Sequence, residues 1–397
     1  MMITRGHGNP MKASPPHVAV LVDTATGWGR RLIEGVHAYV RSTTRWRVWI
    51  DAHGREDALR LPEGWAGDGV IARINSEPMA RHLEDAGVPV INVSSIELDG
   101  VRNFPRVTLD TAATARLAFE HFAERGFRSF GYCGPSRLAY VSQLVSAFER
   151  VVRTKGHTCD VFDPSGGEHD DIAWGAQIMA LCRWIETLPK PVAILCWATF
   201  RAQEVLEACF RLGVDVPEEV AVLAGDDDDL ICDITFPPLS GVVTPSEQIG
   251  LKAAELLQKL MMGEPEPERA LELLPIGVMT RQSTDTLAID DEPVAQAVRF
   301  IRENSTRPIQ VADILKKVPV SRRVLERRFA QVLGRSPAEE IRRIRLAHAA
   351  RLLIHTDLPI PEVAARSGLG TPQYLGRLFG RYYDMSPRRF RDQARAH

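Results

Sequence analysis

Hydroxyl and arginine side chains recur at matching places in two segments near the end of the chain, and the second segment also contains Gln373. A constant offset of 50 residues aligns Ser321 with Thr371, Leu325 with Leu375, Arg327 with Arg377, Phe329 with Phe379, and Ser336-Pro337 with Ser386-Pro387. Arginine can donate two hydrogen bonds to O6 and N7 of guanine, and glutamine can pair with the edge of adenine. The repeated pattern therefore supplies side chains that could read the bases of double-stranded DNA.

The charge of the chain is unevenly divided, and the division supports the same chemistry. Residues 293–397 contain 21 Lys and Arg and 9 Asp and Glu, which gives a net charge of +12. The net charge of the whole chain is −2, so residues 1–292 carry a net charge of −14. A cationic domain binds a polyanion because each Lys or Arg near a phosphate releases condensed counterions. The alternative is that these charges only solvate exposed helical faces.

Helices must position these side chains, and the sequence predicts them in the same order twice. Ser321 and Thr371 are natural N-caps for the second helix of each copy, and Pro319 ends the helix before the first cap. The predicted helices cover residues 311–315 and 321–329 in the first copy, 360–365 and 371–379 in the second, and 338–355 between the copies. We predict an all-α domain over residues 293–397 with two helix-turn-helix motifs.

This segment resembles the DNA-binding domain of the AraC/XylS family of transcription regulators. The residues that carry the resemblance are Ser321–Phe329, Arg345-Leu346, Ala349, Leu352-Leu353, Ile360, Val363-Ala364, Gly368, Tyr374, Arg377, Phe379, Met385-Ser386-Pro387 and Phe390. The family implies two recognition helices that enter successive major-groove segments on one face of DNA. Carried over position by position, the base contacts would be Ser321, Arg322, Arg323, Glu326, Arg327, Thr371, Gln373 and Arg377. Pro372 departs from the polar residue usual at its position, and Arg343 and Arg345 are expected to face phosphates or solvent.

The preceding part of the chain alternates between apolar runs and helical stretches, which predicts parallel sheets covered by helices on both faces. The expected strands are His17–Asp23, Trp46–Asp51, Gly69–Ile74, Val88–Val93, Ser129–Gly134, Val192–Trp197 and Val220–Gly225. The expected helices are Arg31–Val40, Thr111–Arg125, Leu144–Val152, Ile172–Thr187, Ala202–Leu212 and Ser246–Met262. A length of about 265 residues suits two such subdomains better than one.

Three stretches of this part, residues 119–134, 214–227 and 237–250, resemble the ligand-binding half of LacI-type regulators. The resemblance implies an α/β sensor of the type I periplasmic-binding-protein fold, with two subdomains around a cleft, over residues 17–282. Residues 1–16 are predicted to be disordered and residues 283–292 to be a linker. Sensors of this kind pair side by side, so we expect a homodimer, with RNA polymerase as a further candidate partner.

The resemblance also implies a small-molecule effector in the cleft, at the carboxyl ends of the strands. The expected contacts are Trp28, Arg30, Asp110, Tyr140, Trp197 and Asp226, with Phe200 as a further stacking face. The alternatives are that Asp110 only caps a helix and that Trp28 only packs. Sugar-sensing relatives carry an arginine where this chain has Leu144, and an aspartate or asparagine where it has Ala198-Thr199. We expect a small sugar and favour a xylose-like pentose, with a less polar effector as the alternative.

Other chemistries find little support. The run Asp226–Asp229 lacks the ligand spacing of a calcium loop, so no metal is expected. The six cysteines show no C-x-x-C spacing and are predicted to be reduced core residues of a cytoplasmic protein without a membrane span. No phosphate loop or hydrolase motif indicates a cofactor or a catalytic residue. Two alternatives remain: a sugar-acting enzyme with a helical dimerisation module, and a constitutive DNA-binding regulator with a degenerate sensor.

Overall fold

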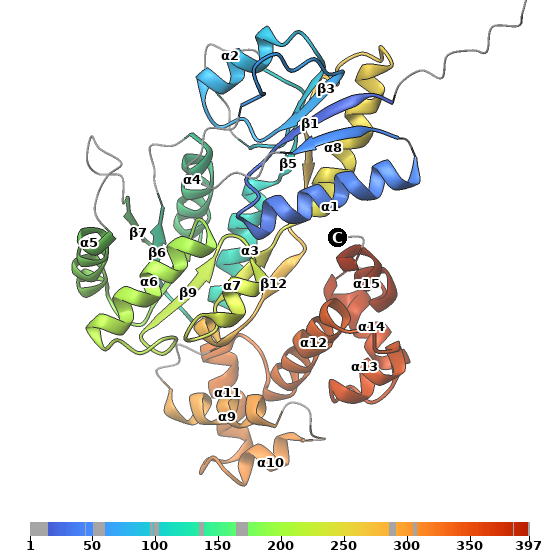
Figure 1. Cartoon of the computed structure of the whole chain (residues 1–397). Helices are drawn as coiled ribbons and strands as arrows, with labels where there is room; N and C mark the ends of the chain where they lie inside the picture. Colours follow the sequence, from blue (N-terminus) through green and yellow to red (C-terminus); the bar gives the residue numbers. More distant parts are fainter. Residues whose placement is uncertain are drawn as a thin grey trace, which may run out of the picture.

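The chain folds into two α/β subdomains and a helical domain formed by its last hundred residues (Figure 1). This computed structural model describes residues 15–43, 45–50, 60–95, 98, 103–134, 139–163, 174–285, 291–304, 307, 309–383 and 385–395. The disordered N-terminus predicted for residues 1–16 lies outside these ranges, apart from Pro15 and Pro16. We call the two α/β subdomains together the sensor and the helical domain the reader domain.

The first subdomain contains a four-stranded parallel sheet in the order β2-β1-β3-β4. A parallel pair, β5 and β11, continues this sheet through a bridge between Asn92 and Arg106. The strands are β1 (His17–Leu21), β2 (Arg47–Ile50), β3 (Gly69–Ala72), β4 (Val90–Asn92), β5 (Val107–Leu109) and β11 (Leu271–Leu273). The helices are α1 (Gly27–Ser42), α2 (Glu77–Asp85) and α8 (Ser246–Met261).

The second subdomain contains a six-stranded sheet in the order β12-β10-β9-β8-β6-β7. Its strands are β6 (Ser129–Cys133), β7 (Cys159–Phe162), β8 (Val192–Cys196), β9 (Val220–Ala224), β10 (Ser240–Val243) and β12 (Gly277–Met279). Its helices are α3 (Thr111–Ala123), α4 (Ala139–Thr154), α5 (Trp174–Thr187), α6 (Thr199–Leu212) and α7 (Asp229–Ile234). The side chains of α3 and α4 pack on one face of the sheet, and those of α5 and α6 pack on the other.

The chain crosses between the subdomains at residues 109–111, 243–246 and 273–277. At these points β5 leads into α3, β10 leads into α8, and β11 leads into β12. The crossings are short, so they hold the two sheets with the carboxyl ends of their parallel strands facing one cavity. This arrangement positions the candidate ligand site.

The predicted sensor fold is confirmed, with differences in its short elements. The seven predicted strands are all present, but β5, β7, β10, β11 and β12 were not predicted, nor were α2 and α7. β5, β11 and β12 have three residues each, which is too short for a periodic pattern to appear. β12 also runs antiparallel to β10, so the second sheet is mixed rather than purely parallel.

The sensor continues into the segment that was predicted to be a linker. A short 3-10 helix, η1 (Gln282–Thr284), buries Ser283 and Thr284 completely. The Ser283 hydroxyl donates to the carbonyl of Val222 at 2.6 Å and so joins η1 to strand β9. Residues 286–290, the middle of the predicted linker, lie outside the described residues.

The reader domain has the predicted double helix-turn-helix architecture. Its helices are α9 (Glu292–Glu303), α10 (Val311–Leu315), α11 (Arg322–Leu333), α12 (Pro337–His355), α13 (Ile360–Arg366), α14 (Pro372–Tyr383) and α15 (Pro387–Arg395). The bounds of α11 and α14 differ by the repeat offset of 50 residues. The domain has two apolar cores, and the long helix α12 contributes Ile341 to the first and Leu353 to the second.

A buried ion-pair cluster fixes the turn between α11 and α12. Glu340 is fully buried, and its carboxylate accepts from Arg335 Nε at 2.5 Å and from Arg343 Nη2 at 2.8 Å. Burial alone would raise the pKa of Glu340, but the charges and hydrogen bonds of Arg343 and Arg335 outweigh it and lower the pKa to about 2. The cluster therefore stays ionised in the folded reader domain.

Replacing Glu340 by alanine should destabilise the reader domain by about 3–5 kcal/mol, because two largely buried guanidinium groups lose their carboxylate. The matched control is Glu362→Ala, which breaks an exposed pair with Arg366 and should cost less than about 1 kcal/mol. Calorimetry of the full chain measures both losses. Because the folded-state pKa of Glu340 is depressed, its contribution is complete above pH 4.5 and is lost as the pH falls toward 2. Equal losses for the two variants would contradict the cluster's role.

Candidate ligand cleft and nucleic-acid interface

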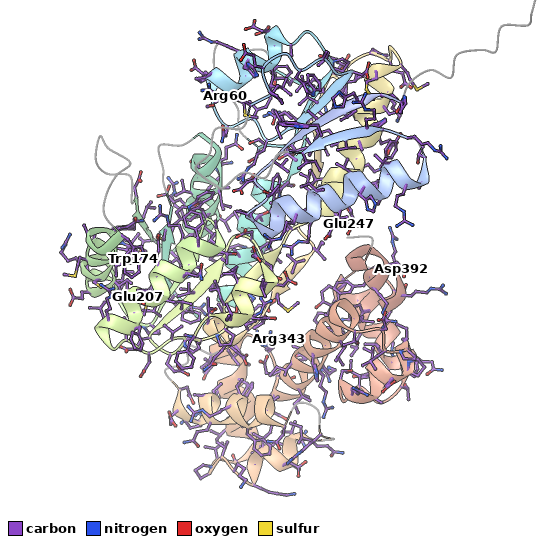
Figure 2. The ribbon with its side chains drawn as sticks, in the orientation of Figure 1. Arg60, Trp174, Glu207, Glu247, Arg343 and Asp392 are labelled. Carbon is purple, nitrogen blue, oxygen red and sulfur yellow. The ribbon has the colours of Figure 1, made fainter. Side chains whose placement is uncertain are left out.

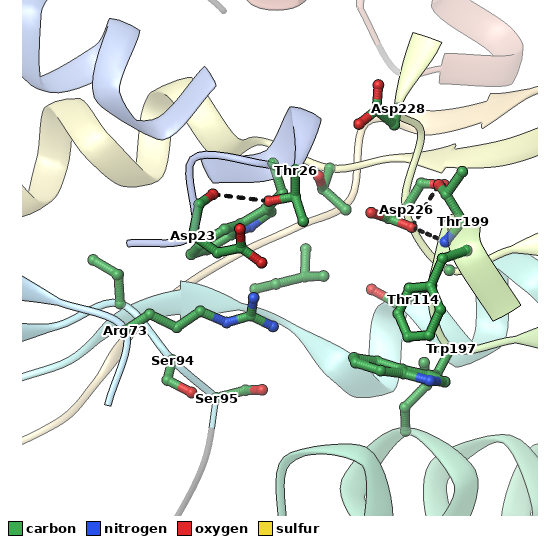
Figure 3. Close-up of a pocket in the computed structure, with 18 of the residues that line it drawn as sticks. Asp23, Thr26, Arg73, Ser94, Ser95, Thr114, Trp197, Thr199, Asp226 and Asp228 are labelled. Atoms are coloured by element: carbon green, nitrogen blue, oxygen red, sulfur yellow. Dashed lines mark hydrogen bonds between the residues drawn. The ribbon is translucent and has the colours of Figure 1, made fainter. Parts of the chain in front are cut away.

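A cavity of about 440 Å³ lies between the two subdomains, at the carboxyl ends of their strands (Figure 3). This volume is in the range of small-molecule sites in proteins. Polar residues that follow strands of both sheets line it: Asp23 after β1, Arg73 and Asn75 after β3, Ser94 and Ser95 after β4, Asp226 and Asp228 after β9, and Thr244 after β10. The aromatic part of the lining consists of Trp28, Trp197 and Phe200.

Asp23 is a strong candidate for a ligand contact on the first subdomain. Its side chain is buried, and Oδ1 accepts a hydrogen bond from the backbone N–H of Ala25 at 3.0 Å. Its other oxygen, Oδ2, is buried without a hydrogen-bond partner among the described residues. A buried acceptor of this kind is costly unless a ligand or a water satisfies it.

Asp226 faces the cavity from the second subdomain. Its Oδ1 accepts from the Thr199 backbone N–H at 2.6 Å and from the Thr199 hydroxyl at 2.9 Å, and Figure 3 shows both bonds. Burial raises the pKa of Asp226 above its ordinary value, although the hydrogen bonds from Thr199 oppose that change. Thr199 thus orients this carboxylate at the start of α6 rather than leaving a gap in the polar lining.

Aromatic rings stand on both sides of the cavity. The guanidinium carbon of Arg73 lies 4.8 Å from the centre of the Trp28 ring, a cation–π contact inside the first subdomain. Trp197 and Phe200 meet edge to face, with ring centres 5.3 Å apart, at the beginning of α6. The cavity therefore combines flat apolar surfaces with carboxylate and hydroxyl oxygens, which is the mixture that a sugar requires.

The predicted ligand residues fall into three groups: those that line the cavity, those that do not, and Tyr140, whose side chain is not described. Trp28, Trp197 and Asp226 line the cavity, as do Phe200 and the two departures, Leu144 and Thr199. Asp110 and Arg30 are not part of the lining. Asp110 is the N-cap of α3 and accepts from the Ala113 backbone N–H at 2.8 Å, as in the capping alternative. Tyr140 lies in α4, and its side chain is outside the described residues.

Arg30 joins the two subdomains instead of lining the cavity, because an aspartate of the opposite subdomain lies beside it. Asp228 accepts from Arg30 at 3.3 Å and from the backbone N–H of Gly27, the first residue of α1, at 2.7 Å. A Cβ atom on Gly27 would lie 2.8 Å from the Asp228 carboxyl carbon, so a larger residue here would displace the carboxylate. Arg31 adds an ion pair with Asp229 at 3.3 Å. We call these contacts between the start of α1 and Asp228-Asp229 the latch.

Sequence reasoning missed several cavity residues that had a recognisable signal. Asp23, Arg73 and Ser94 are polar residues placed directly after buried strands, which is where parallel sheets bind ligands. Thr111 and Thr114, in the first turn of α3, also line the cavity. Their role depends on the crossing between β5 and α3, which was not predicted because β5 is so short.

The part of the chain that the structure describes offers neither a metal site nor a membrane-spanning helix. No group of three or more His, Cys, Asp or Glu side chains there could hold a metal ion, and each aspartate of the 226–229 run has a separate partner. No helix among those described residues is long and apolar enough to cross a membrane.

The residues predicted to contact DNA bases share an exposed position. Ser321, Arg322, Arg323, Glu326, Arg327, Thr371, Gln373 and Arg377 are all exposed. The Ser321 and Thr371 hydroxyls accept from backbone N–H groups of Val324 and Tyr374, so both act as N-caps as predicted. On α14, Gln373 and Arg377 point away from the core formed by Leu375 and Phe379. The two helices thus present polar side chains on their outer faces.

Two arginines that were expected to face phosphates or solvent have internal partners instead. Arg343 is largely buried against Glu340. Arg345 donates to the backbone carbonyls of Arg307 and Ile309 and so holds the segment before α10. Neither guanidinium is available as a simple phosphate contact, because neighbouring segments of the chain already use its donors.

Comparison with protein families gives separate matches for the sensor and for the reader domain. Residues 17–114 match the XylR N-terminal domain, and residues 119–284 match the periplasmic binding protein-like domain. Residues 314–393 match a helix-turn-helix domain. The matches therefore cover both subdomains of the sensor and most of the reader domain.

Similar proteins match over almost the whole chain. The xylose operon regulatory protein of Escherichia coli strain K12 is 30% identical over 383 residues, which cover 94% of this chain and 96% of that protein. The protein of the same name from Haemophilus influenzae is 26% identical, over 94% of this chain and 97% of its own length. The solved structure of a xylose-binding transcription activator, xylR, aligns with a TM-score of 0.61 at 28% identity, over 96% of this chain and 99% of that one.

The latch predicts unequal costs for its two sides. Asp228→Ala should destabilise the sensor by about 1–3 kcal/mol, because the buried N–H of Gly27 loses its acceptor. Arg30→Ala removes only a half-exposed partner of the same carboxylate and should cost less than about 1 kcal/mol. Urea unfolding of the full chain measures both. A larger loss for Arg30→Ala than for Asp228→Ala would contradict this account.

Proposed function

The chain belongs to the family of the xylose operon regulatory proteins, and we propose that it is a regulator of transcription whose DNA binding responds to xylose. It is a sequence-specific DNA-binding regulator controlled by a small sugar, and its family consists of regulators rather than enzymes. The finer assignment to xylose rests on the names of the similar proteins, and one observation above all supports a sugar in the cavity. The cavity presents a carboxylate from each subdomain, Asp23 and Asp226, beside aromatic rings.

A pentose suits this cavity chemically. Its hydroxyl groups can donate to the free Oδ2 of Asp23 on one side and to Asp226 on the other, while Trp28 or Trp197 covers its C–H surface. A ligand that bonds both subdomains favours the closed arrangement, because closure brings both sets of partners within reach at once. These contacts argue against a degenerate sensor, although Leu144 replaces the arginine of sugar-sensing relatives.

The DNA-binding half of the function rests on α11 and α14. Arg323 and Arg377 occupy the exposed face of these helices, where each could contact a guanine in the major groove. Two chains bound side by side would place four recognition helices on a repeated operator, so a homodimer is the expected active form. RNA polymerase is a further partner of such a regulator, and the cytoplasm is the compartment in which it meets DNA.

The sugar assignment predicts a ligand-dependent rise in stability. Xylose at a hundred times its Kd should add about 2.7 kcal/mol to the stability of the sensor. Asp226→Ala should remove this effect and leave DNA binding without sugar unchanged, whereas the exposed control Asp215→Ala should respond like the original chain. Thermal shift against a panel of pentoses and hexoses measures the effect. A sensor that responds to none of them would refute a sugar effector.

The reader assignment predicts a loss of sequence preference. Arg323→Ala and Arg377→Ala should each weaken binding to DNA selected from a random pool by about 1–3 kcal/mol and relax preference at one position. Arg211→Ala, an exposed arginine on α6 paired with Glu207, is the control and should change nothing. Gel shifts at fixed salt measure the affinities. Equal losses on selected and unselected DNA would show that the two arginines do not read bases.

A further inference from the structure

Two arginines of the reader domain contact the end of helix α3. Arg343 Nη1 lies 3.3 Å from the Glu124 carboxylate, and Arg335 Nη2 donates to the Glu124 backbone carbonyl at 2.7 Å. Glu124 is the C-cap of α3, where backbone carbonyls lack helical partners and favour a nearby cation. In Figure 2, Arg343 lies where the reader domain meets the second subdomain. We call this set, Glu124 with Arg335 and Arg343, the dock.

Contacts within the reader domain hold both arginines of the dock in place. Buried Glu340 holds both guanidinium groups, leaving Nη1 of Arg343 and Nη2 of Arg335 directed at Glu124. The pKa of Arg343 is raised because the charges of Glu340, Glu124 and Asp285 outweigh its burial. Because the arginines are already ordered, docking costs little side-chain entropy.

The second half of the reader domain also comes close to the dock. Tyr383, the last residue of α14, is partly buried, and burial followed by the negative charge of Glu124 raises its pKa to about 12. The dock therefore lies close to the end of a recognition helix as well as to α12.

The same end of α3 also organises the exit of the chain from the sensor. Arg125 Nε donates to the Thr284 carbonyl at 2.8 Å, and the His121 ring and the Thr284 hydroxyl lie 2.8 Å apart. Thr284 is fully buried and is the last residue of η1. Only Asp285 follows it among the described residues of the sensor. The covalent connection and the dock thus start from one helix end.

The opposite end of α3 lies at the ligand cavity. Thr111 and Thr114 line the cavity, Asp110 caps the helix, and residues 109–111 form one of the crossings between the subdomains. With 13 residues, α3 spans about 20 Å from the cavity and the crossing to the dock. One rigid helix therefore touches the effector site, a hinge segment and the reader domain.

We propose that α3 and the dock carry the state of the effector cavity to the reader domain within one chain. This inference rests on the proposed function, because it takes the cavity as the sugar site. When the cleft closes, the subdomains rotate relative to each other at the crossings. The dock makes the reader domain move as one body with α3, so the orientation of α11 and α14 follows the state of the cleft. Without the dock, only the covalent chain would transmit the motion.

A charge reversal at Glu124 tests the dock, since its side chain is half exposed and is not part of the cavity or of the DNA-facing surface. Glu124→Arg places a third positive charge against Arg335 and Arg343, and Glu124→Gln removes the charge alone. The matched control is Glu120→Arg, the same change one turn earlier at an exposed position of α3. Each variant is the full chain, and its xylose affinity should be unchanged.

The first measurement is the affinity for the DNA selected from a random pool, taken with and without xylose and expressed as a ratio. Coupling of this kind is typically on the order of 5–150-fold, and we expect it to fall to about one in Glu124→Arg, to an intermediate value in Glu124→Gln, and to stay unchanged in Glu120→Arg. A full ratio in Glu124→Arg would overturn the proposal, and so would an equal loss in Glu120→Arg.

The second measurement does not depend on the effector. Small-angle scattering should give a larger radius of gyration for Glu124→Arg than for the original chain and for Glu120→Arg, because the reader domain leaves the sensor. An unchanged radius in Glu124→Arg would overturn the dock. If the original chain shows no response to xylose, the proposed effector fails, and the scattering comparison still decides whether the dock holds the two domains together.

Discussion

The arrangement of the sensor depends on how four consecutive carboxylates are kept apart. Unpaired burial of a charge costs on the order of several kcal/mol, so the buried aspartates of the run that follows β9 need donors of their own, whereas Asp229 is exposed. The donors are Thr199 for Asp226, Arg281 for Asp227, Gly27 and Arg30 for Asp228, and Arg31 for Asp229. Asp226 and Asp228 thereby line the cavity, and Asp228 and Asp229 also pair with arginines of the opposite subdomain. The contacts between the two subdomains at this edge of the cleft follow from that division.

The positive charge of the reader domain is divided in a similar way. Arginines on the outer faces of α11 and α14 stay exposed, whereas Arg335 and Arg343 turn inward to Glu340 and to the sensor. A basic domain beside an acidic sensor could bind it indiscriminately and hide its DNA-facing surface. Because Glu340 holds two arginines in one place, they contact the sensor at the end of α3. The recognition helices remain accessible while the two domains are joined.

Much of the fold was predictable because its signals are local. Alternating apolar runs predicted the longer strands of both sheets, and capping residues predicted the starts of α11 and α14. The site was only partly predictable. Trp28, Trp197 and Asp226 follow or begin recognised elements and do line the cavity, whereas Asp23 and Ser94 were overlooked although they end recognised strands. β5 and β11 have three residues each, so the crossings next to them left no periodic pattern to read.

The sequence by itself determined the two-part architecture, the doubled DNA-binding motif and the residue types available for a sugar, because each depends on neighbours within a few turns of chain. Only the tertiary structure decided what individual charged residues do. Arg30 meets Asp228, 198 positions away, and Arg343 meets Glu124, 219 positions away. A guanidinium can serve a ligand, a phosphate or a carboxylate equally well. Its role is set by whichever partner the fold brings within hydrogen-bond distance, and no local pattern contains that information.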